Sequence, residues 1–401
     1  MEATRNTTMR KEPVVAPILC AGWDKKLSIA MKACRLPGRL PRADLTHRAS
    51  EPVVVITGGS SGIGRSVAAL FARRGWKVGL ISRSAEGLAA AGREIEAAGG
   101  RVAIGRADVT DSVALGAVAD AIVAALGPID VWINCAGNGV YGRFSSVPEA
   151  EFHRVTDVTY HGTVNGTRVA LRHMRPRGRG AIVNVCSAMA FYGLPLMSSY
   201  AGAKAAVRAF GQAVRAELAL ERSAIRLGTV FPPAVNTPFF SHATSHMGWP
   251  ARPAPPVYQP EVVAEGIWQA MISGRAEMTI SGTAAAFSLV SRLLPGLVAR
   301  CIERYGSERQ MTRDPDACRL EEPTLFAPSP RASPVHGPFG RQARGYSTHL
   351  WLLRLRIAGV RWLTTLWREG ARWPDVPSPS IPPPPEPDRE LGGLGARPGA
   401  S

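Results

Sequence analysis

Six short apolar runs recur between residue 52 and about residue 283, and they limit the possible fold more than any other feature of the chain. The runs are Val53–Ile56, Val78–Ile81, Val102–Ile104, Val131–Ile133, Ala181–Val185 and Ile225–Val230. Stretches of helical composition separate them. Strands that read as continuous apolar runs are buried on both faces, which is typical of a parallel sheet covered by helices. We therefore expect an α/β fold with a doubly wound parallel sheet.

The charge of the chain invites a second interpretation, which its composition weakens. The formal net charge is +17 over 401 residues, but few of the 48 basic residues are lysines and the whole chain is rich in Ala, Gly, Arg and Pro. A bias spread over a whole chain is typical of genome composition rather than of a binding face. We expect no nucleic-acid partner; steeply salt-dependent binding would be the sign of one.

The spacing of the cysteines and histidines does not indicate a metal site. The 6 cysteines are scattered without a CxxC pair, and their pattern favours a reducing compartment over a disulfide framework. His153, His161, His242 and His246 show no ligand spacing, so we interpret them as surface or pocket-lining residues. A cytoplasmic location follows, with membrane attachment as described below.

Composition divides the chain into four parts. Residues 1–50 form a basic leader that we expect to be disordered, with a mitochondrial-type transit segment as the alternative. Residues 51–283 form the α/β domain, and residues 284–313 an amphipathic helical extension. Residues 314–401 form a tail with nearly half of the 33 prolines, which argues against a compact second domain of ordinary kind.

A glycine-rich turn follows the first apolar run and opens a helix predicted over Arg65–Arg74. Glycines allow a tight turn and let the backbone approach a pyrophosphate, and the helix N-terminus offers unpaired N–H groups to it. The turn predicts a nucleotide-binding site. Its residues expected to contact the cofactor are Thr57, Gly58, Ser60, Ser61, Gly62, Ile63 and Gly64.

Further residues follow in order along residues 52–283: Asp108 with Val109 after the third run, Asn134 with Ala136 and Gly137 after the fourth, Ser187 after the fifth, and Tyr200 with Lys204 beyond it. With the glycine-rich turn, these positions resemble the motifs of the short-chain dehydrogenase/reductase family, whose fold is of the Rossmann type. The resemblance implies an oxidoreductase that uses NAD(H) or NADP(H). It implies that Asp108 contacts the adenine ring.

The catalytic group implied by the resemblance is Ser187, Tyr200 and Lys204. Tyr200 and Lys204 lie four residues apart in a stretch of helical composition, Ser199–Leu220, so both face one side of a helix. A free tyrosine titrates near pH 10, and a cation one turn away would lower that pKa. In the family the tyrosine exchanges a proton with the substrate oxygen, the serine holds that oxygen, and the lysine also contacts the nicotinamide ribose.

Two positions depart from the family pattern. Thr159 stands where the family has a fourth catalytic residue, an asparagine, and Asn165 cannot replace it because it faces another side of the helix. Pro233 stands where a glycine usually follows the proline after the sixth strand. Val235 and Thr237 still match positions that bind the nicotinamide carboxamide.

The end of the second apolar run predicts the cofactor. Ser82 replaces the acidic residue that would repel a 2′-phosphate, and Arg83 beside it can pair with that phosphate. We expect NADP(H) to be preferred over NAD(H).

We expect a secondary alcohol or ketone as substrate and a homo-oligomer as the assembly. The alternative function is a cofactor-binding sensor or scaffold with little turnover, which Thr159 and Pro233 favour.

Two regions outside the motifs carry further expectations. The loop Phe231–Pro260 and the helix Glu261–Ser273 should close over the substrate. The loop region holds Phe239, Phe240, Met247, Trp249 and Tyr258, which indicate a lipophilic substrate or, alternatively, anchor the loop to the core.

In the tail, residues 350–368 predict a helix (about 348–369) with an arginine stripe beside a Leu/Trp face. This helix suits a membrane surface, and docking on the protein body is the alternative.

Overall fold

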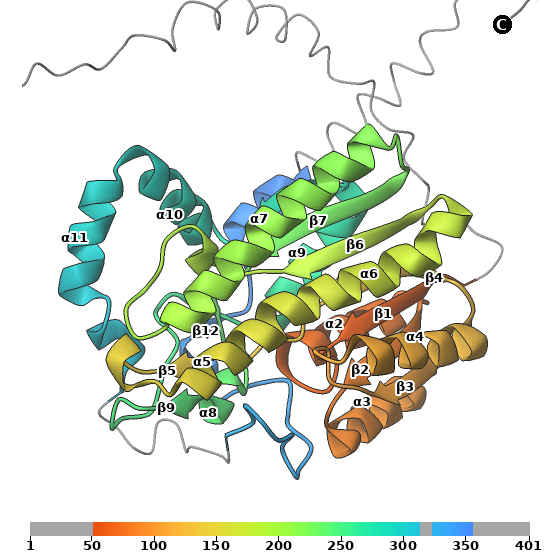
Figure 1. Ribbon diagram of the computed structural model, residues 1–401, viewed down its shortest axis with the longest axis horizontal. Helices are drawn as coiled ribbons and strands as arrows, with labels where there is room; N and C mark the ends of the chain where they lie inside the picture. The colour runs from red at the N-terminus through yellow and green to blue at the C-terminus, as the bar shows by residue number, and fades with distance from the viewer. Residues whose placement is uncertain (1–50, 313–322, 356–401) are drawn as a thin grey trace, which may run out of the picture. The chain divides into compact units, whose positions relative to one another are not determined.

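The computed structural model describes residues 51–312 and 323–355 (Figure 1). Contacts divide the chain into two units, Met1–Leu353 and Arg354–Ser401, and the sheet lies in the first. Its seven parallel strands are β1 (Val53–Thr57), β2 (Lys77–Ser82), β3 (Val102–Arg106), β4 (Ile129–Asn134), β6 (Gly180–Val185), β7 (Ile225–Phe231) and β11 (Glu277–Thr279), in the order β11-β7-β6-β4-β1-β2-β3. The doubly wound parallel sheet expected from the sequence is confirmed.

Helices cover both faces of this sheet (Figure 1). They are α2 (Gly62–Arg73), α3 (Ala85–Ala97), α4 (Ser112–Leu126), α5 (Glu149–Thr156), α6 (Gly162–Met174), α7 (Ser198–Leu220) and α9 (Pro260–Ser273). Strand β1 shows why two cores form: Val54 and Ile56 pack on the side of α2 and α9, and Val53 and Val55 pack on the side of α4 and α6. Alternate side chains of a strand point to opposite faces, so a buried strand must be apolar throughout.

The seventh strand, β11, has no counterpart among the predicted runs. It spans three residues, and only Met278 is buried, so its sequence lacks the continuous apolar run of a central strand. It pairs with β7 alone, at the edge of the sheet. Tertiary context, rather than local pattern, makes this segment a strand.

The strand order places a crevice at the carboxyl ends of two central strands, β1 and β4. The chain proceeds outward from β1 through β2 to β3 and then returns to β4, which pairs with the other side of β1. The connections after β1 and β4 therefore diverge, and a space opens between them at the carboxyl ends of the strands. Ligands of doubly wound sheets bind at such a switch point.

Short elements follow the sheet in the region that was expected to be a loop. They are β8 (Ala234–Val235), α8 (Phe239–His242), β9 (Thr244–Ser245) and β10 (Val257–Tyr258). β9 pairs with β5 (Val140–Tyr141), and β10 lies between β8 and β12 (Ala343–Arg344) in a second small parallel sheet. The tail therefore contributes a strand to the body of the protein.

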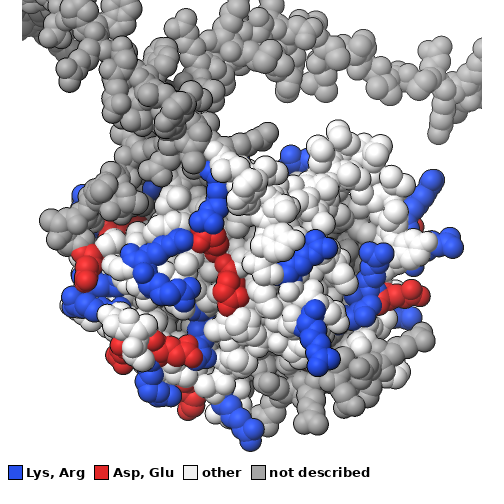
Figure 2. Space-filling view, turned by 180° about the vertical axis from the view of Figure 1, so that it is seen from behind, with Lys and Arg blue, Asp and Glu red and all other residues white. Residues whose placement is uncertain are grey.

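Two further helices, α10 (Gly282–Leu293) and α11 (Pro295–Tyr305), extend from the edge of the body that lies beside α7 in Figure 1. Among the described residues no single helix is long and apolar enough to cross a membrane. Together α10 and α11 have the required length and apolar composition, but the chain bends by 120° between them. On the face shown in Figure 2, Lys and Arg side chains stand apart among acidic and uncharged residues.

Candidate active site

A cavity of about 800 Å³ lies at the switch point, and its wall includes residues at the carboxyl ends of β1, β2, β3, β4, β6 and β7. This cavity, the cleft, is lined by Arg83 and Asp108, by the turn after β1, and by Tyr200 and Lys204. Most of the residues predicted as site residues therefore share one space. Thr57, Asn134 and Thr159 lie behind its surface.

The glycine-rich turn forms part of the floor of the cleft. A Cβ atom on Gly58 would lie 2.9 Å from the backbone of Ala136, and Gly58 and Gly62 have φ values of +70° and +50°. A Cβ on Gly64 would overlap the carbonyl oxygen of Gly58. Only glycine fits these positions without strain. Ser60, Ser61 and Ile63 line the cleft between them, at the N-terminus of α2.

Thr57 and Asn134 hold the floor together from beneath. The Thr57 hydroxyl accepts a hydrogen bond from the backbone N–H of Cys135 at 3.1 Å, and so ties the end of β1 to the end of β4. The Asn134 side chain accepts from the indole of Trp132 at 2.7 Å and donates to Asn184 on β6 at 2.9 Å. The two buried side chains thereby position Ala136 and Gly137, which line the cleft.

Arg83 and Asp108 lie at the ends of β2 and β3. Asp108 accepts hydrogen bonds from Arg154 and from the hydroxyl of Thr110, and its carboxylate lies 3.7 Å from the Arg83 guanidinium. Burial alone would raise the pKa of Asp108, but these hydrogen bonds outweigh it and hold the pKa below its ordinary value. The charged form of Asp108 is therefore favoured. Val109 lines the cleft beside it.

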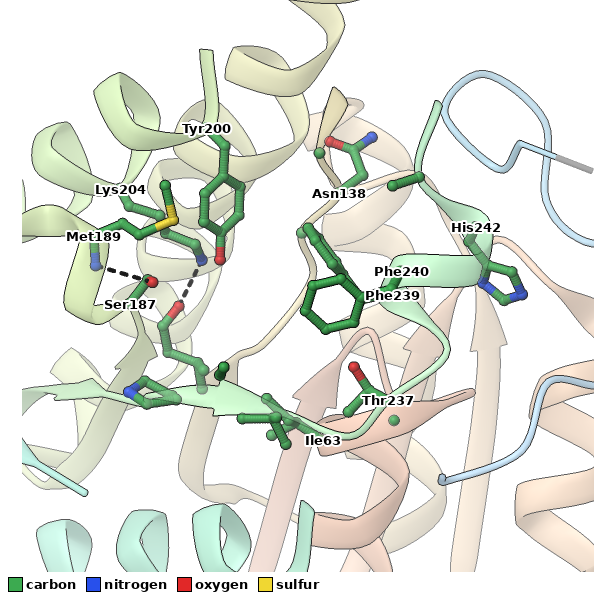
Figure 3. Close-up of a pocket in the computed structure, with 18 of the residues that line it drawn as sticks. Ile63, Asn138, Ser187, Met189, Tyr200, Lys204, Thr237, Phe239, Phe240 and His242 are labelled. Atoms are coloured by element: carbon green, nitrogen blue, oxygen red, sulfur yellow. Dashed lines mark hydrogen bonds between the residues drawn. The ribbon is translucent and has the colours of Figure 1, made fainter. Parts of the chain in front are cut away.

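Ser187, Tyr200 and Lys204 meet at the other end of the floor (Figure 3). Ser187 follows β6, and its hydroxyl accepts from the backbone N–H of Met189 at 3.2 Å. The Lys204 ammonium donates to the carbonyl oxygen of Val185 at 2.8 Å and lies 5.6 Å from the centre of the Tyr200 ring. The contact with Met189 does not use the hydroxyl proton of Ser187, which is directed at the Tyr200 oxygen instead.

The electrostatics of this group differ from the expectation that a nearby cation lowers the Tyr200 pKa. Burial raises the pKa of Tyr200 above its ordinary value, and a hydrogen bond from Ser187 opposes this only in part. Burial also lowers the pKa of Lys204. The lysine is itself desolvated and turned toward the Val185 carbonyl, so its charge does not offset the burial of the phenol.

Thr159 lies on a π-helical turn, η2 (Asp157–His161), between α5 and α6. Its hydroxyl donates to the backbone oxygen of Asn138 at 3.4 Å, and Thr163 donates to the backbone oxygen of Thr159 at 2.9 Å. Asn165 points away and donates to Val109 at 3.0 Å. Single π turns are often found at functional sites. The position expected to carry the family asparagine is thus distinctive in backbone as well as in residue type.

Asn138 is a residue of this site that the sequence analysis did not single out. It lines the cleft, and neither polar atom of its side chain has a hydrogen-bond partner among the described residues, although both atoms are buried. A buried carboxamide without a partner is unfavourable, which makes it a group for a ligand to satisfy. It directly follows the glycine of the predicted Asn-Cys-Ala-Gly motif, and this adjacency was the only available signal.

The segment after β7 passes beside Ser187 and lines the cleft. The carbonyl oxygen of Pro232 accepts from the backbone N–H of Ala188 at 3.0 Å, and Pro233 lines the cleft beside it. Val235 lies in β8, and a Cβ on Gly62 would come within 3.2 Å of Thr237. Thr237 therefore faces the glycine-rich turn, and Val235 lines the same cleft.

The end of the cleft that holds Tyr200 is apolar. Phe239, Phe240, Met189, Met197, Phe287 and Tyr305 line it. Of the aromatic residues expected there, Tyr258 is instead buried in the main core on β10, and Trp249 is exposed. The loop aromatics thus divide between the two interpretations: Phe239 and Phe240 face the cleft, whereas Tyr258 anchors the loop.

Histidines and acidic residues form no metal site among the described residues, where no cluster of three potential ligands occurs. His153, His161 and His246 each lie near one carboxylate, and His242 lines the cleft. The cleft fits a dinucleotide for three reasons. The turn after β1 has glycines where other residues would carry a Cβ atom, the N-terminus of α2 lies beside that turn, and the turn and Tyr200 line one cavity. The fold and the site therefore define a dinucleotide-binding oxidoreductase.

Comparisons with known proteins agree with this class. The sequence profile of the short chain dehydrogenase family matches residues 52–248. The oxidoreductase YxnA of Bacillus subtilis (strain 168) is 32% identical over 278 residues, covering 69% of this chain and 78% of YxnA. Levodione reductase of Leifsonia aquatica is 33% identical over 205 residues, covering 50% of this chain and 76% of the reductase. This chain belongs to the short-chain dehydrogenase/reductase family.

Solved structures place the fold in the same group. Actinorhodin polyketide ketoreductase with NADPH has a TM-score of 0.53 and 26% identity, covering 57% of this chain and 95% of the ketoreductase. A short-chain dehydrogenase from Burkholderia phymatum in complex with NAD has a TM-score of 0.57 and 24% identity, covering 62% and 95% of the two chains. This protein is an NAD(P)-dependent dehydrogenase or reductase, and its neighbours include both cofactors.

Proposed function

We propose that this enzyme interconverts a ketone and a secondary alcohol, with NADP(H) as cofactor and Tyr200 as the acid and base. The observation that carries the proposal is the meeting of Ser187, Tyr200 and Lys204 at the apolar end of the cleft. Bound NADPH supplies a hydride for the carbonyl carbon. The chain's own residues handle the oxygen and its proton.

Each of the three residues has a distinct role in this proposal. The Ser187 hydroxyl turns its proton from the Tyr200 oxygen to the substrate oxygen beside it, since the contact with Met189 does not use that proton. In reduction the Tyr200 hydroxyl gives its proton to that oxygen, and in oxidation the phenolate takes it back. The Lys204 ammonium, desolvated beside Tyr200, favours the phenolate whenever it forms.

The choice of NADP(H) rests on the end of β2. Ser82 and Arg83 both line the cleft there, and the Ser82 hydroxyl bonds to that of Ser60 at 2.8 Å. No carboxylate stands at Ser82 to repel a 2′-phosphate, and the Arg83 guanidinium supplies a positive charge at the same point. NAD(H) is the less favoured cofactor in this proposal.

The substrate is lipophilic in this proposal, because apolar side chains surround the catalytic end of the cleft. Phe239 packs on the ring of Tyr200 with centroids 5.7 Å apart, and Phe287 and Tyr305 contribute from α10 and α11. The unpartnered Asn138 carboxamide is the polar exception. A panel of ketones of increasing chain length tests this, with NADPH consumption as the readout.

Failure of that panel would favour the alternative function. If NADPH binds, seen as a change in its fluorescence, but no ketone consumes it and no alcohol reduces NADP⁺, the chain acts as a cofactor-binding sensor or scaffold. Steady consumption with any lipophilic ketone contradicts that alternative.

We further propose peripheral attachment of a cytoplasmic enzyme to an anionic membrane. Leu289 and Leu293 on α10, Leu297 on α11 and Leu294 between the two helices are exposed. Phe287 and Tyr305 of the same helices line the cleft. The tail helix expected over about 348–369 lies mostly outside the described residues. Leu350 and Leu353 at its start are buried in the core, while Trp351 and Leu352 are exposed. Its first turns thus support the docking interpretation.

Flotation with anionic liposomes tests the membrane proposal on the full chain. Replacing Leu293 and Leu297 with glutamate should abolish flotation, because charged side chains do not enter the membrane interface. Leu220→Glu is the matched control, since Leu220 is exposed at the end of α7. If the double variant still floats with the liposomes, α10 and α11 do not form the membrane contact.

A further inference from the structure

The described part of the tail returns to the cleft and crosses its open side. This segment, residues 323–344, is here named the strap. Near its start, the backbone N–H of Thr324 donates to the carbonyl oxygen of His242 at the end of α8, and at its end β12 pairs with β10. In Figure 1 it is drawn in blue.

The first anchor of the strap is Arg83. Its guanidinium donates to three successive carbonyl oxygens, those of Thr324 at 2.6 Å, Phe326 at 3.0 Å and Leu325 at 3.3 Å. Arg154 also donates to the Leu325 carbonyl, at 3.2 Å. The Leu325 side chain is 3% exposed and belongs to a small apolar cluster with Val140 and Val155.

The second anchor is the glycine-rich turn and the helix that follows it. The backbone N–H of Gly62 donates to the carbonyl oxygen of Pro334 at 3.2 Å, and the Arg65 side chain donates to that of Ser333 at 2.7 Å. Arg65 is 7% exposed and pairs with Glu94 through its other nitrogens. The strap thus binds both to the glycine-rich turn itself and to the first turn of α2.

The third anchor is Asn236, between β8 and α8. Its carbonyl oxygen accepts from the N–H of Gly337 at 3.3 Å, and its side-chain oxygen accepts from the N–H of Phe339 at 2.9 Å. A Cβ atom on Gly337 would overlap the carbonyl oxygen of Thr237. The strap therefore lies directly on the segment that carries Val235 and Thr237.

The strap covers the cleft without filling it. Thr324, Pro328, Ser329 and Ser333 line the same cavity of about 800 Å³ as Arg83, Gly62 and Tyr200. Space for a ligand thus remains between the strap and the floor. With all three anchors in place, however, the strap stands across the side from which a dinucleotide would approach the turn after β1.

We propose that the strap closes over the bound dinucleotide and retains it, so that cofactor can enter or leave only when the strap opens. The inference rests on dinucleotide binding in the cleft and is independent of which substrate is used. Arg83 links cofactor binding to closure of the strap, because its guanidinium lines the cleft and also donates to the strap. The strap is thus a further part of the cofactor site.

Stopped-flow measurement of NADPH release, followed by its fluorescence, tests the proposal without any ketone. Leu325→Ala removes the buried side chain at one anchor, and Gly337→Ala forces the strap away from Thr237 at another. Each variant should speed release by at least about tenfold, with a smaller gain in the binding rate, so affinity falls. Unchanged rates would overturn the proposal, and tighter binding would mean that the strap competes with the cofactor.

Two controls make the same chemical changes where the strap is not anchored. Leu352→Ala alters a leucine that is 54% exposed, and Gly345→Ala adds a Cβ with nothing within 4 Å. Both should keep the release rate of the parent protein. If the controls speed release as much as the two anchor variants, general loosening of the tail explains the effect and the proposal is wrong.

Limited trypsin digestion of the unmodified chain gives a second measurement. Arg331 is exposed on the strap and is followed by Ala332, so trypsin can cleave there. Saturating NADPH should slow this cleavage, because bound cofactor keeps the strap closed. Faster or unchanged cleavage contradicts retention. Absence of ketone turnover would count against the proposed function alone, because neither measurement uses a substrate.

Discussion

The floor and the outer wall of the cleft are built in different ways. The floor consists of the ends of β1, β4 and β6, where Thr57 and Asn134 are 1% and 3% exposed and bond from strand to strand. The outer wall consists of the strap, the region around α8, and α10 with α11. Its contacts with the floor are mostly backbone carbonyl oxygens that accept from Arg83, Arg65 and Gly62.

This difference separates two tasks within one site. Buried side-chain networks leave few alternative arrangements, so the floor can hold Ser187, Tyr200 and Lys204 in place during turnover. Contacts to backbone carbonyls can break and reform without changing the core. The wall is therefore suited to the admission and release of ligands, and the floor to chemistry.

The largest effect is expected when the reacting proton is removed from the floor, which tests whether the floor carries out the chemistry. Tyr200→Phe keeps the ring and its packing on Phe239 but removes the hydroxyl, so turnover should fall by about 10² or more. Binding of NADPH should persist, because the wall and the glycine turn are unchanged. Steady-state rates and fluorescence titration measure the two effects.

A matched control for this variant is Tyr160→Phe. Tyr160 packs against Phe210 and is not among the residues that line the cleft. It should keep normal turnover. Near-normal turnover of Tyr200→Phe, or an equal loss in both variants, would contradict the assignment of Tyr200.

The next effect concerns Arg83, which follows β2 and holds the strap of the outer wall. Arg83→Ala should lower the ratio of kcat/KM with NADPH to that with NADH by about tenfold or more, since it removes the charge that faces the 2′-phosphate. It should also speed cofactor release, because the strap loses an anchor. Arg106→Ala is the control, as Arg106 bonds to the Arg83 backbone outside the cleft. An unchanged ratio refutes the cofactor assignment.

A smaller effect is expected at Thr159, beneath the floor. Thr159→Asn restores the family carboxamide on the π turn and should raise turnover by about threefold, roughly the gain from one better-placed hydrogen bond. Thr159→Val, which keeps the shape but loses the hydroxyl, should leave turnover unchanged because the existing bond to Asn138 is long, at 3.4 Å. A slower Asn variant with an unchanged melting temperature would show that threonine is the better residue here.

The smallest expected effect is the pH dependence of reduction. Burial raises the pKa of Tyr200, so its hydroxyl stays protonated and able to donate as pH rises. kcat/KM for ketone reduction should therefore stay constant from about pH 6 to about pH 9, whereas alcohol oxidation, which needs the phenolate, should rise over that range. A fall in reduction near neutral pH would show that the bound cofactor lowers this pKa strongly.

Much of the floor could be predicted because its geometry restricts residue type. Positive φ values at Gly58 and Gly62 require glycine, and strands buried on both faces require continuous apolar runs. Tyr200 and Lys204 lie on one helix, so their spacing alone brings them together. The six predicted runs all became strands of the sheet, within a residue or two at each end.

The wall could not be predicted in the same way. The carbonyl oxygens that hold Arg83 belong to Thr324, Leu325 and Phe326, and any residues there would offer the same acceptors. Strand β11 was missed because only one of its residues is buried. The division of Phe239 and Phe240 from Tyr258 depends on the path of a loop, which periodicity does not describe.

The order of synthesis gives the strap one more consequence. Its contact between Arg65 and Ser333 joins residues 268 positions apart, whereas every strand of the main sheet precedes residue 280. Closing so long a loop comes late in folding, and chains emerge from the ribosome N-terminus first. The sheet that forms the floor of the cleft can therefore fold first, and the strap closes over it last.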